Sequence, residues 1–214
     1  LYDRLNSQEA VLAERVYAPW VDMEAAMRAA GIPLFSLESR RPLAGFDVIG
    51  FTLPYEQLYT NLLNMLDLAG LPVRAVERGE GHPLVIAGGG ATYNPEPLAD
   101  FVDAFVLGEG EDLVLDITAA VGESKRQGST REELLRQLGT EEEVRLGVRQ
   151  AVERGHAVHH LADLFQVIDR FLFVTAFCRD FHFGISWNPK THDAHDGLQI
   201  NGFFFVVKIN IRLV

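Results

Sequence analysis

The sequence predicts an open α/β domain in which helices cover both faces of a doubly wound, mostly parallel sheet. Short apolar runs alternate with amphipathic segments through residues 1–139. The short runs are apolar almost throughout, which is typical of parallel strands buried on both faces. Strands that alternate with helices imply right-handed crossovers between parallel neighbours.

The elements follow one another along residues 1–121. Residues 1–6 look like the last turns of a helix whose beginning is missing, so we expect the chain to be a fragment. The predicted strands cover residues 11–17, 46–51, 84–87 and 104–107. The predicted helices cover residues 22–30, 56–69, 97–101 and 112–121. Asp22 is a candidate N-cap of the first helix, and Gly31 and Gly70 are stop signals for the first two.

The composition changes near residue 140. Residues 1–139 carry 21 acidic and 11 basic side chains, whereas residues 140–214 carry 9 and 8. Six of the seven histidines and nine of the fourteen phenylalanines lie in the second part. We therefore expect a boundary there, with an unassigned α+β extension over 140–214. A helix is predicted over 141–154, a second helix or a helix running into a strand over 158–174, and strands over 181–187 and 203–213.

Charge and cysteine content exclude several classes of function. The formal net charge is −11, and an acidic chain is a poor ligand for nucleic acid, which needs clustered Lys and Arg. The single cysteine, Cys178, excludes an internal disulfide and a site built from cysteines alone. No apolar run approaches the ~20 residues of a membrane helix, and no leader opens the chain. We expect a cytoplasmic protein that binds neither nucleic acid nor membrane.

Three strand ends carry the candidate binding residues. They are Thr52 after the second predicted strand, the triple glycine Gly88, Gly89 and Gly90 after the third, and Gly108, Glu109 and Gly110 after the fourth. In open α/β sheets, ligands bind beyond the carboxyl ends of the strands. Glycines let the backbone approach a flat or anionic ligand closely. Each feature also has an ordinary structural explanation as a turn, a helix start or a polar residue after a strand.

The tail offers weaker candidates. His156 and His160 have the i, i+4 spacing of metal ligands on one helix face, but a third ligand is missing. Cys178 with His182 could form a nucleophile pair, although a buried thiol among phenylalanines explains the cysteine better. Asp193 to Gly197 has the composition of a cofactor-ligating histidine loop without the helix that should follow. We predict no metal site and no catalytic residue in the chain.

The strand-end loops belong to a longer pattern. It combines a glycine pair, the Pro-Glu element at Pro95-Glu96, and Gly108-Glu109-Gly110-Glu111. Further similar stretches cover residues 11–20, 35–39, 46–53 and 59–66. Over residues 8 to about 124, the chain resembles the N-terminal cobalamin-binding-like domain of radical SAM proteins. The most similar subgroup is one of uncharacterised radical SAM proteins that carry a cobalamin (B12)-binding domain.

The resemblance implies a Rossmann-like accessory domain ahead of a catalytic barrel. That barrel would hold a [4Fe–4S] cluster on three cysteines and cleave S-adenosylmethionine. With Cys178 alone, this chain cannot hold the cluster, so we expect no catalysis from it. The expected partner is the radical SAM catalytic domain, in cis or in trans.

The resemblance also implies a cobalamin site. Thr52 maps to a hydroxyl position of the family, and Gly88-Gly89 maps to its glycine pair. A corrinoid would lie over the carboxyl edge with its nucleotide tail admitted beside Gly88 and Gly89, and residues 108–110 would form the rim. The alternatives are a degenerate domain that serves only as a docking surface and, less well supported, a phosphoacceptor receiver-like domain.

The first strand of this fold, with its histidine loop, would precede Leu1. Its absence would leave buried backbone N–H and C=O groups without ladder partners, at about 1–3 kcal/mol each. The β-prone segment 202–211 is the best candidate to cover the gap. We therefore predict that this segment pairs into the sheet position that this missing central strand leaves vacant.

Overall fold

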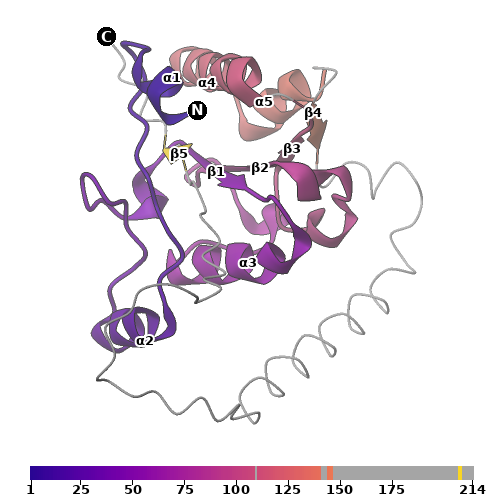
Figure 1. Ribbon diagram of the computed structural model, residues 1–214. Coiled ribbons are helices and arrows are strands. Elements are labelled where there is room, and N and C mark those ends of the chain that lie inside the picture. Colours follow the sequence, from indigo (N-terminus) through magenta and orange to yellow (C-terminus); the bar gives the residue numbers. More distant parts are fainter. Residues whose placement is uncertain (109, 141–143, 147–206, 209–214) are drawn as a thin grey trace. The chain divides into compact units, whose positions relative to one another are not determined.

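The sheet has three parallel strands at its centre. In this computed structural model, which describes residues 1–108, 110–140, 144–146 and 207–208, the central strands are β1 (Val48–Thr52), β2 (Leu84–Gly88) and β3 (Ala104–Val106). The two short antiparallel edge strands are β4 (Val144–Leu146) and β5 (Val207–Lys208). The strand order is β4-β3-β2-β1-β5. Figure 1 shows this sheet between two layers of helices.

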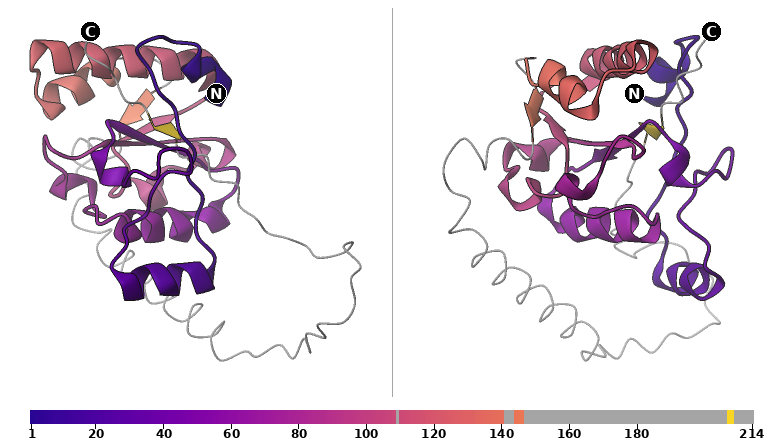
Figure 2. Two further views of the ribbon diagram at one scale, coloured as in Figure 1. Left: turned by 90° about the vertical axis from the view of Figure 1, so that its left-hand side faces the viewer. Right: turned by 180° about the vertical axis from the view of Figure 1, so that it is seen from behind.

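Helices cover both faces of the sheet, as predicted. One face carries α3 (Tyr59–Leu68), with α2 (Val21–Ala30) beyond it, and the other carries α1 (Tyr2–Asn6), α4 (Gly110–Gln127) and α5 (Arg131–Leu138). Both views of Figure 2 show the same layers. Single 3₁₀ turns complete the connections: η1 (Leu43–Gly45), η2 (Glu56–Leu58), η3 (Ala75–Glu77), η4 (Gly90–Tyr93) and η5 (Glu96–Leu98).

The alternation of side chains along each strand divides the core into two clusters. Ile49 and Phe51 of β1 lie in the cluster that α3 covers, whereas Val48 lies in the cluster that α4 covers. β2 alternates in the same way, with Val85 on the α3 side and Ile86 on the α4 side. Apolar residues are therefore required at every position, which is why the strand sequences are continuously apolar.

Four local predictions are wrong. Residues 11–17 form no strand: Ala13 packs into the α4 cluster and Val16 into the α3 cluster, but no residue of the segment joins the ladder. Asp22 is not an N-cap: helix α2 begins at Val21, and Asp22 accepts a hydrogen bond from the Met23 amide.

The helix predicted over 97–101 is the single 3₁₀ turn η5. The helix predicted over 141–154 is contradicted at 144–146, where β4 pairs with β3.

The sequence prediction also missed one helix, α5. It begins with a capping box in which the Glu133 amide donates to Thr130 Oγ1 and the Thr130 amide donates to Glu133. The Thr-x-x-Glu spacing at 130–133 is the signal that could have found it. Gly31 caps α2 as predicted, with φ of 64°.

The predicted pairing of segment 202–211 with the sheet is confirmed at two residues, although they form an edge strand and not a central one. Lys208 pairs with Ile49 and Val207 with Gly50, both antiparallel, at the outer edge of β1. The rest of segment 202–211 lies outside the described residues, as do His156, His160, Cys178, His182, the 193–197 loop and the elements predicted at 158–174 and 181–187. The boundary at residues 139 and 140 remains a prediction.

Candidate functional site

A pocket of about 230 Å³ opens at the carboxyl ends of the three parallel strands, on the face that α4 covers. We call it the carboxyl-edge pocket. It contains five of the seven predicted site residues: Thr52, Gly88, Gly89, Gly108 and Gly110. The remaining lining consists of Leu1, Val48, Gly50, Phe51, Ile86, Val106, Glu111 and Val114. The strand ends that the sequence singled out therefore meet at one place.

The pocket exists because glycines, which have no side chain, occupy strand positions that face α4. Val48, Gly50 and Thr52 alternate along β1, and Gly50 stands where a larger side chain would reach toward α4. Gly88 of β2 is paired in register with Thr52. A Cβ at Gly88 would lie 3.6 Å from the Val106 Cβ, at ordinary contact distance. The floor of the pocket is therefore open because glycines occupy these positions.

Gly89 and Gly90 have a structural reason to be glycine. Gly89 has φ of 105° and ψ of 179°, a region that is essentially restricted to glycine. A Cβ on Gly89 would lie 2.8 Å from the Leu53 carbonyl oxygen, and one on Gly90 would lie 3.1 Å from the Pro54 carbonyl oxygen. The glycine loop thus packs its backbone directly on the loop after β1. Gly90 does not line the pocket.

Buried hydroxyl groups hold this glycine loop in place. Tyr59 of α3 donates to the carbonyl oxygens of Ala91 and Asn94, at 2.9 and 3.0 Å. Thr92 Oγ1 lies 2.6 Å from the Gly89 carbonyl oxygen and 3.2 Å from that of Val106. Burial, and secondarily the charge of Glu56, raise the pKa of Tyr59. The sequence analysis missed both residues, because each acts through backbone groups distant in sequence.

The other rim of the pocket is the start of α4. Gly108 has φ of 93° and turns the chain from β3 toward the helix, whose first residue is Gly110. Glu109 lies outside the described residues. Leu1 closes the side of the pocket next to Gly110, where a Cβ would lie 3.9 Å from the Leu1 Cδ2.

The chemistry of the lining suits a flat, mostly apolar group. Branched and aromatic side chains form the walls, and Thr52 and Glu111 are the polar side chains. The Thr52 hydroxyl makes no hydrogen bond to another described residue. No basic side chain is among the described residues that line the pocket, so they offer no countercharge to a phosphate.

The pocket accommodates only part of a corrinoid. Pockets that enclose whole small-molecule ligands measure about 300–1,000 Å³, which exceeds the 230 Å³ found here. The pocket could therefore take up only part of a corrinoid, such as the base of its nucleotide arm. The apolar lining would suit the flat base of that arm, whereas the described lining residues offer no basic side chain to its phosphate.

The side chains and helices of the described residues bear on metal binding and on membrane insertion. Within them, no three His, Cys, Asp or Glu side chains lie close enough to hold a metal ion. None of their helices combines the length and the apolar character needed to cross a bilayer.

Comparison with known proteins shows the family. Curated proteins and solved structures give no match to the chain. A scan of protein families matches residues 1–145 to the family described as radical SAM proteins, N-terminal. The match covers α1 to α5, all three parallel strands and the carboxyl-edge pocket. The chain therefore belongs to the radical SAM proteins, of which it carries the N-terminal domain.

Proposed function

We propose that this domain is a non-catalytic accessory module that binds a corrinoid for a radical SAM enzyme. The carboxyl-edge pocket supports the proposal, because Thr52, Gly88, Gly89, Gly108 and Gly110 meet there with an apolar lining. The nucleotide arm would occupy the pocket, with Thr52 as a hydrogen-bond partner. Glu109, between Gly108 and Gly110 in the sequence, is a further candidate contact to the corrinoid.

The radical chemistry would belong to the catalytic domain. Membership of the family implies a [4Fe–4S] cluster and S-adenosylmethionine in the parent protein, and one cysteine cannot hold such a cluster. A bound corrinoid would supply methyl-transfer or radical chemistry of its own. The residues of this chain would bind the arm, exclude water from it and orient the ring.

The test is retention of colour. The full chain is incubated with hydroxocobalamin, desalted, and its visible spectrum recorded. Cobinamide, which lacks the nucleotide base, is the matched ligand control. We expect retained absorbance with hydroxocobalamin and at least tenfold less with cobinamide, because the base is the part that enters the pocket. A colourless protein after both incubations would contradict corrinoid binding.

Thr52→Val isolates the role of the hydroxyl. The two side chains have nearly the same shape, so the substitution leaves the pocket volume unchanged while removing the hydrogen bond. We expect about a five- to tenfold weaker affinity for hydroxocobalamin, which corresponds to one hydrogen bond of about 1 kcal/mol. Gly81→Ala, at a site outside this pocket, is the control and should bind like the parent chain.

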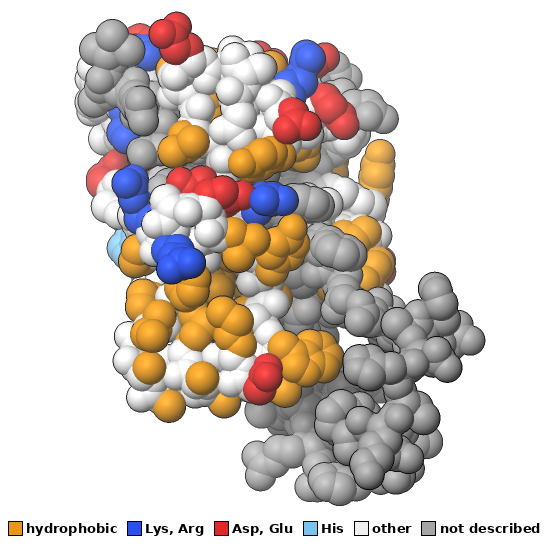
Figure 3. Space-filling view, turned by 60° about the vertical axis from the view of Figure 1, so that its left-hand side comes forward, with side chains coloured by type: hydrophobic (Ala, Val, Ile, Leu, Met, Phe, Trp, Pro, Cys, Tyr) orange, Lys and Arg blue, Asp and Glu red, His pale blue; other side chains and the backbone are white. Residues whose placement is uncertain are grey.

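Docking without a ligand is the second candidate function. Trp20 and Val21, at the start of α2, are 71% and 70% exposed, which is unusual for large apolar side chains. Figure 3 shows exposed apolar side chains on the surface of the molecule where α2 lies. The partner would be the radical SAM catalytic domain, in cis or in trans. Binding of that purified domain by a chain that retains no corrinoid, with loss of binding in Trp20→Ser, would favour docking.

A further inference from the structure

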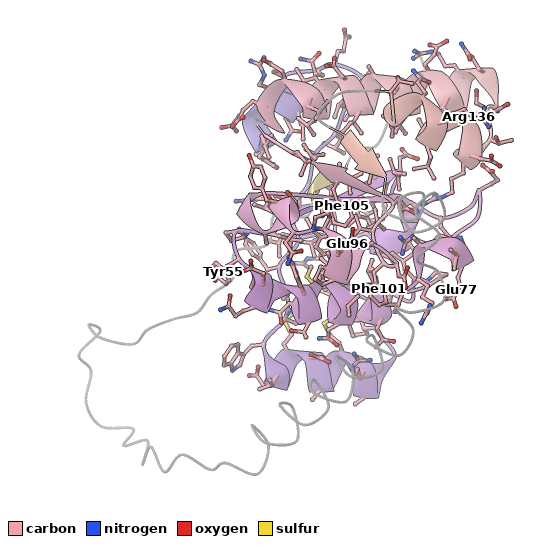
Figure 4. All side chains as sticks on the ribbon, turned by 90° about the vertical axis from the view of Figure 1, so that its right-hand side faces the viewer. Tyr55, Glu77, Glu96, Phe101, Phe105 and Arg136 are labelled. Atoms are coloured by element: carbon pink, nitrogen blue, oxygen red, sulfur yellow. The ribbon has the colours of Figure 1, made fainter. Side chains whose placement is uncertain are left out.

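A second cavity lies at the amino edge of the sheet, away from the carboxyl-edge pocket. It measures about 480 Å³ and runs between η3, the loop that leads into β2, and α5. Arg78, Arg131 and Arg136 line it, and we call it the arginine groove. Figure 4 labels Glu77 and Arg136 toward one side of the molecule and Tyr55, in the loop after β1, toward the other.

The floor of the arginine groove holds more positive than negative charge. Asp103, just before β3, is 2% exposed and accepts from Arg131 at 2.7 Å. The same carboxylate oxygen lies 3.3 Å from Arg78, whose side chain is fully buried. Among the described residues, two guanidinium groups therefore share one buried carboxylate. A buried charge without a partner is unfavourable, and an anion in the groove would compensate it.

Arg78 has one donor left over. Its terminal nitrogens donate to the carbonyl oxygens of Pro72, Val73 and Phe101 at 2.7–3.1 Å, besides contacting Asp103. The remaining Nε is buried and has no hydrogen-bond partner among the described residues. A buried unpaired donor calls for an acceptor that these residues do not supply. Burial lowers the pKa of the Arg78 guanidinium; Asp103 and, more weakly, Glu77 oppose this effect, and the charge of Arg131 adds to it.

The carboxylates on the rim compensate this charge poorly. Glu80 is exposed, and both of its oxygens accept from the Arg131 amide at the start of α5. Glu132 is 78% exposed and lies 3.4 Å from Arg136, which is itself 55% exposed. Exposed pairs of this kind are screened by water and contribute little. Arg136 is thus able to turn toward a ligand in the groove.

We propose that the arginine groove binds a phosphate group, as inorganic phosphate or as a phosphate monoester. The two negative charges of a phosphate dianion would be balanced by two positive charges. One is the charge on the floor that Asp103 does not neutralise, and the other is the charge of Arg136 on the rim. Guanidinium groups suit phosphate because their planar N–H donors form paired, charge-assisted hydrogen bonds to its oxygens. This site is independent of the corrinoid proposal, since it lies at the opposite edge of the sheet and shares no residue with the first pocket.

The test follows the thermal unfolding of the full chain in inorganic phosphate, acetate and chloride at equal ionic strength. A ligand that binds only the folded state raises the midpoint in a saturable way. We expect a saturable rise with phosphate and a smaller one with acetate, because a monocarboxylate carries less charge. No rise above chloride, or equal effects of phosphate and acetate, would overturn the proposal.

Two variants locate the site. Arg136→Gln should raise the apparent Kd for phosphate about tenfold, as expected for the loss of one charge-assisted contact. Arg126→Gln is the matched control, because Arg126 is 56% exposed on α4, pairs with Glu123 and lies outside the groove. It should bind phosphate like the parent chain. An equal loss in the two variants would show a general charge effect and would also overturn the proposal.

Discussion

Replacing Gly89 by alanine should be among the most destabilising small substitutions in this protein. Gly89 combines two constraints that are separate at other glycines. Its φ of 105° with ψ of 179° is unfavourable for any residue that has a Cβ. In addition, that Cβ would lie 2.8 Å from the Leu53 carbonyl oxygen and 3.0 Å from the Leu53 carbonyl carbon.

The expected loss in free energy of unfolding follows from both constraints. The backbone conformation alone contributes about 1–3 kcal/mol. Relieving the contact requires the loops after β1 and β2 to separate, which weakens two hydrogen bonds, Leu53 N to Gly88 O at 2.7 Å and Ala91 N to Leu53 O at 2.9 Å. Each contributes about 1 kcal/mol. The sum for Gly89→Ala is about 3–5 kcal/mol.

Alanine substitutions at two other glycines measure the contribution of the backbone conformation separately from that of the close contact. Gly70 has φ of 69° but open space around its Cβ position, so Gly70→Ala should lose only about 1–2 kcal/mol. Gly81 has neither constraint, and Gly81→Ala should stay within about 0.5 kcal/mol of the parent. Urea unfolding followed by far-UV circular dichroism measures all three. If Gly89→Ala lost no more than Gly70→Ala, the close packing of the two loops would be refuted.

The remaining predictions concern the amino edge and α5. Asp103→Asn leaves Arg78 and Arg131 without their shared carboxylate and should lower the free energy of unfolding by about 3–5 kcal/mol, measured in urea. A loss below about 1 kcal/mol would contradict the buried charge excess. Thr130→Ala removes the N-cap of α5 and should cost about 1 kcal/mol, measured the same way. The Thr130 backbone and side-chain hydrogen bonds lower the pKa of Glu133, so its stabilisation is complete above the unfolded pKa and is lost as the pH falls through the lower folded value. Thermal midpoints measured from pH 6 to pH 3 should therefore fall less steeply in Glu133→Gln than in the parent, and equal slopes would contradict this.

The sequence predicted the parallel centre of the sheet better than its edges. Strands β1, β2 and β3 are recognisable because burial on both faces demands continuous apolar runs. Residues 11–17 place apolar side chains on either side of Glu14 and Arg15 but form no ladder, and only Ala13, Glu14 and Val16 among them are buried. The edge strand β4 interrupts a segment with a helical pattern. Whether such a segment forms a strand depends on the presence of a neighbouring strand to pair with. The local sequence pattern carries no information about that neighbour.

The candidate site was predictable in position but not in detail. Thr52, Gly88 and Gly108 could be grouped from sequence, because the carboxyl ends of parallel strands share one edge. The triple glycine suggested close approach of a ligand, whereas the structure shows close approach of another loop at Gly89 and Gly90. Tyr59 and Thr92, which fix that loop, gave no sequence signal.

The sequence by itself determined the class of fold, the apolar strands and the glycines that follow them, since these depend on local pattern and on the absence of a side chain. Only the tertiary structure decided what each glycine faces. It also brought Arg78, Asp103 and Arg131 together from three separate segments and placed β5 against β1. Such contacts join residues that are far apart in the chain. They depend on how the whole chain packs, and the conformational preferences of the local sequence do not determine them.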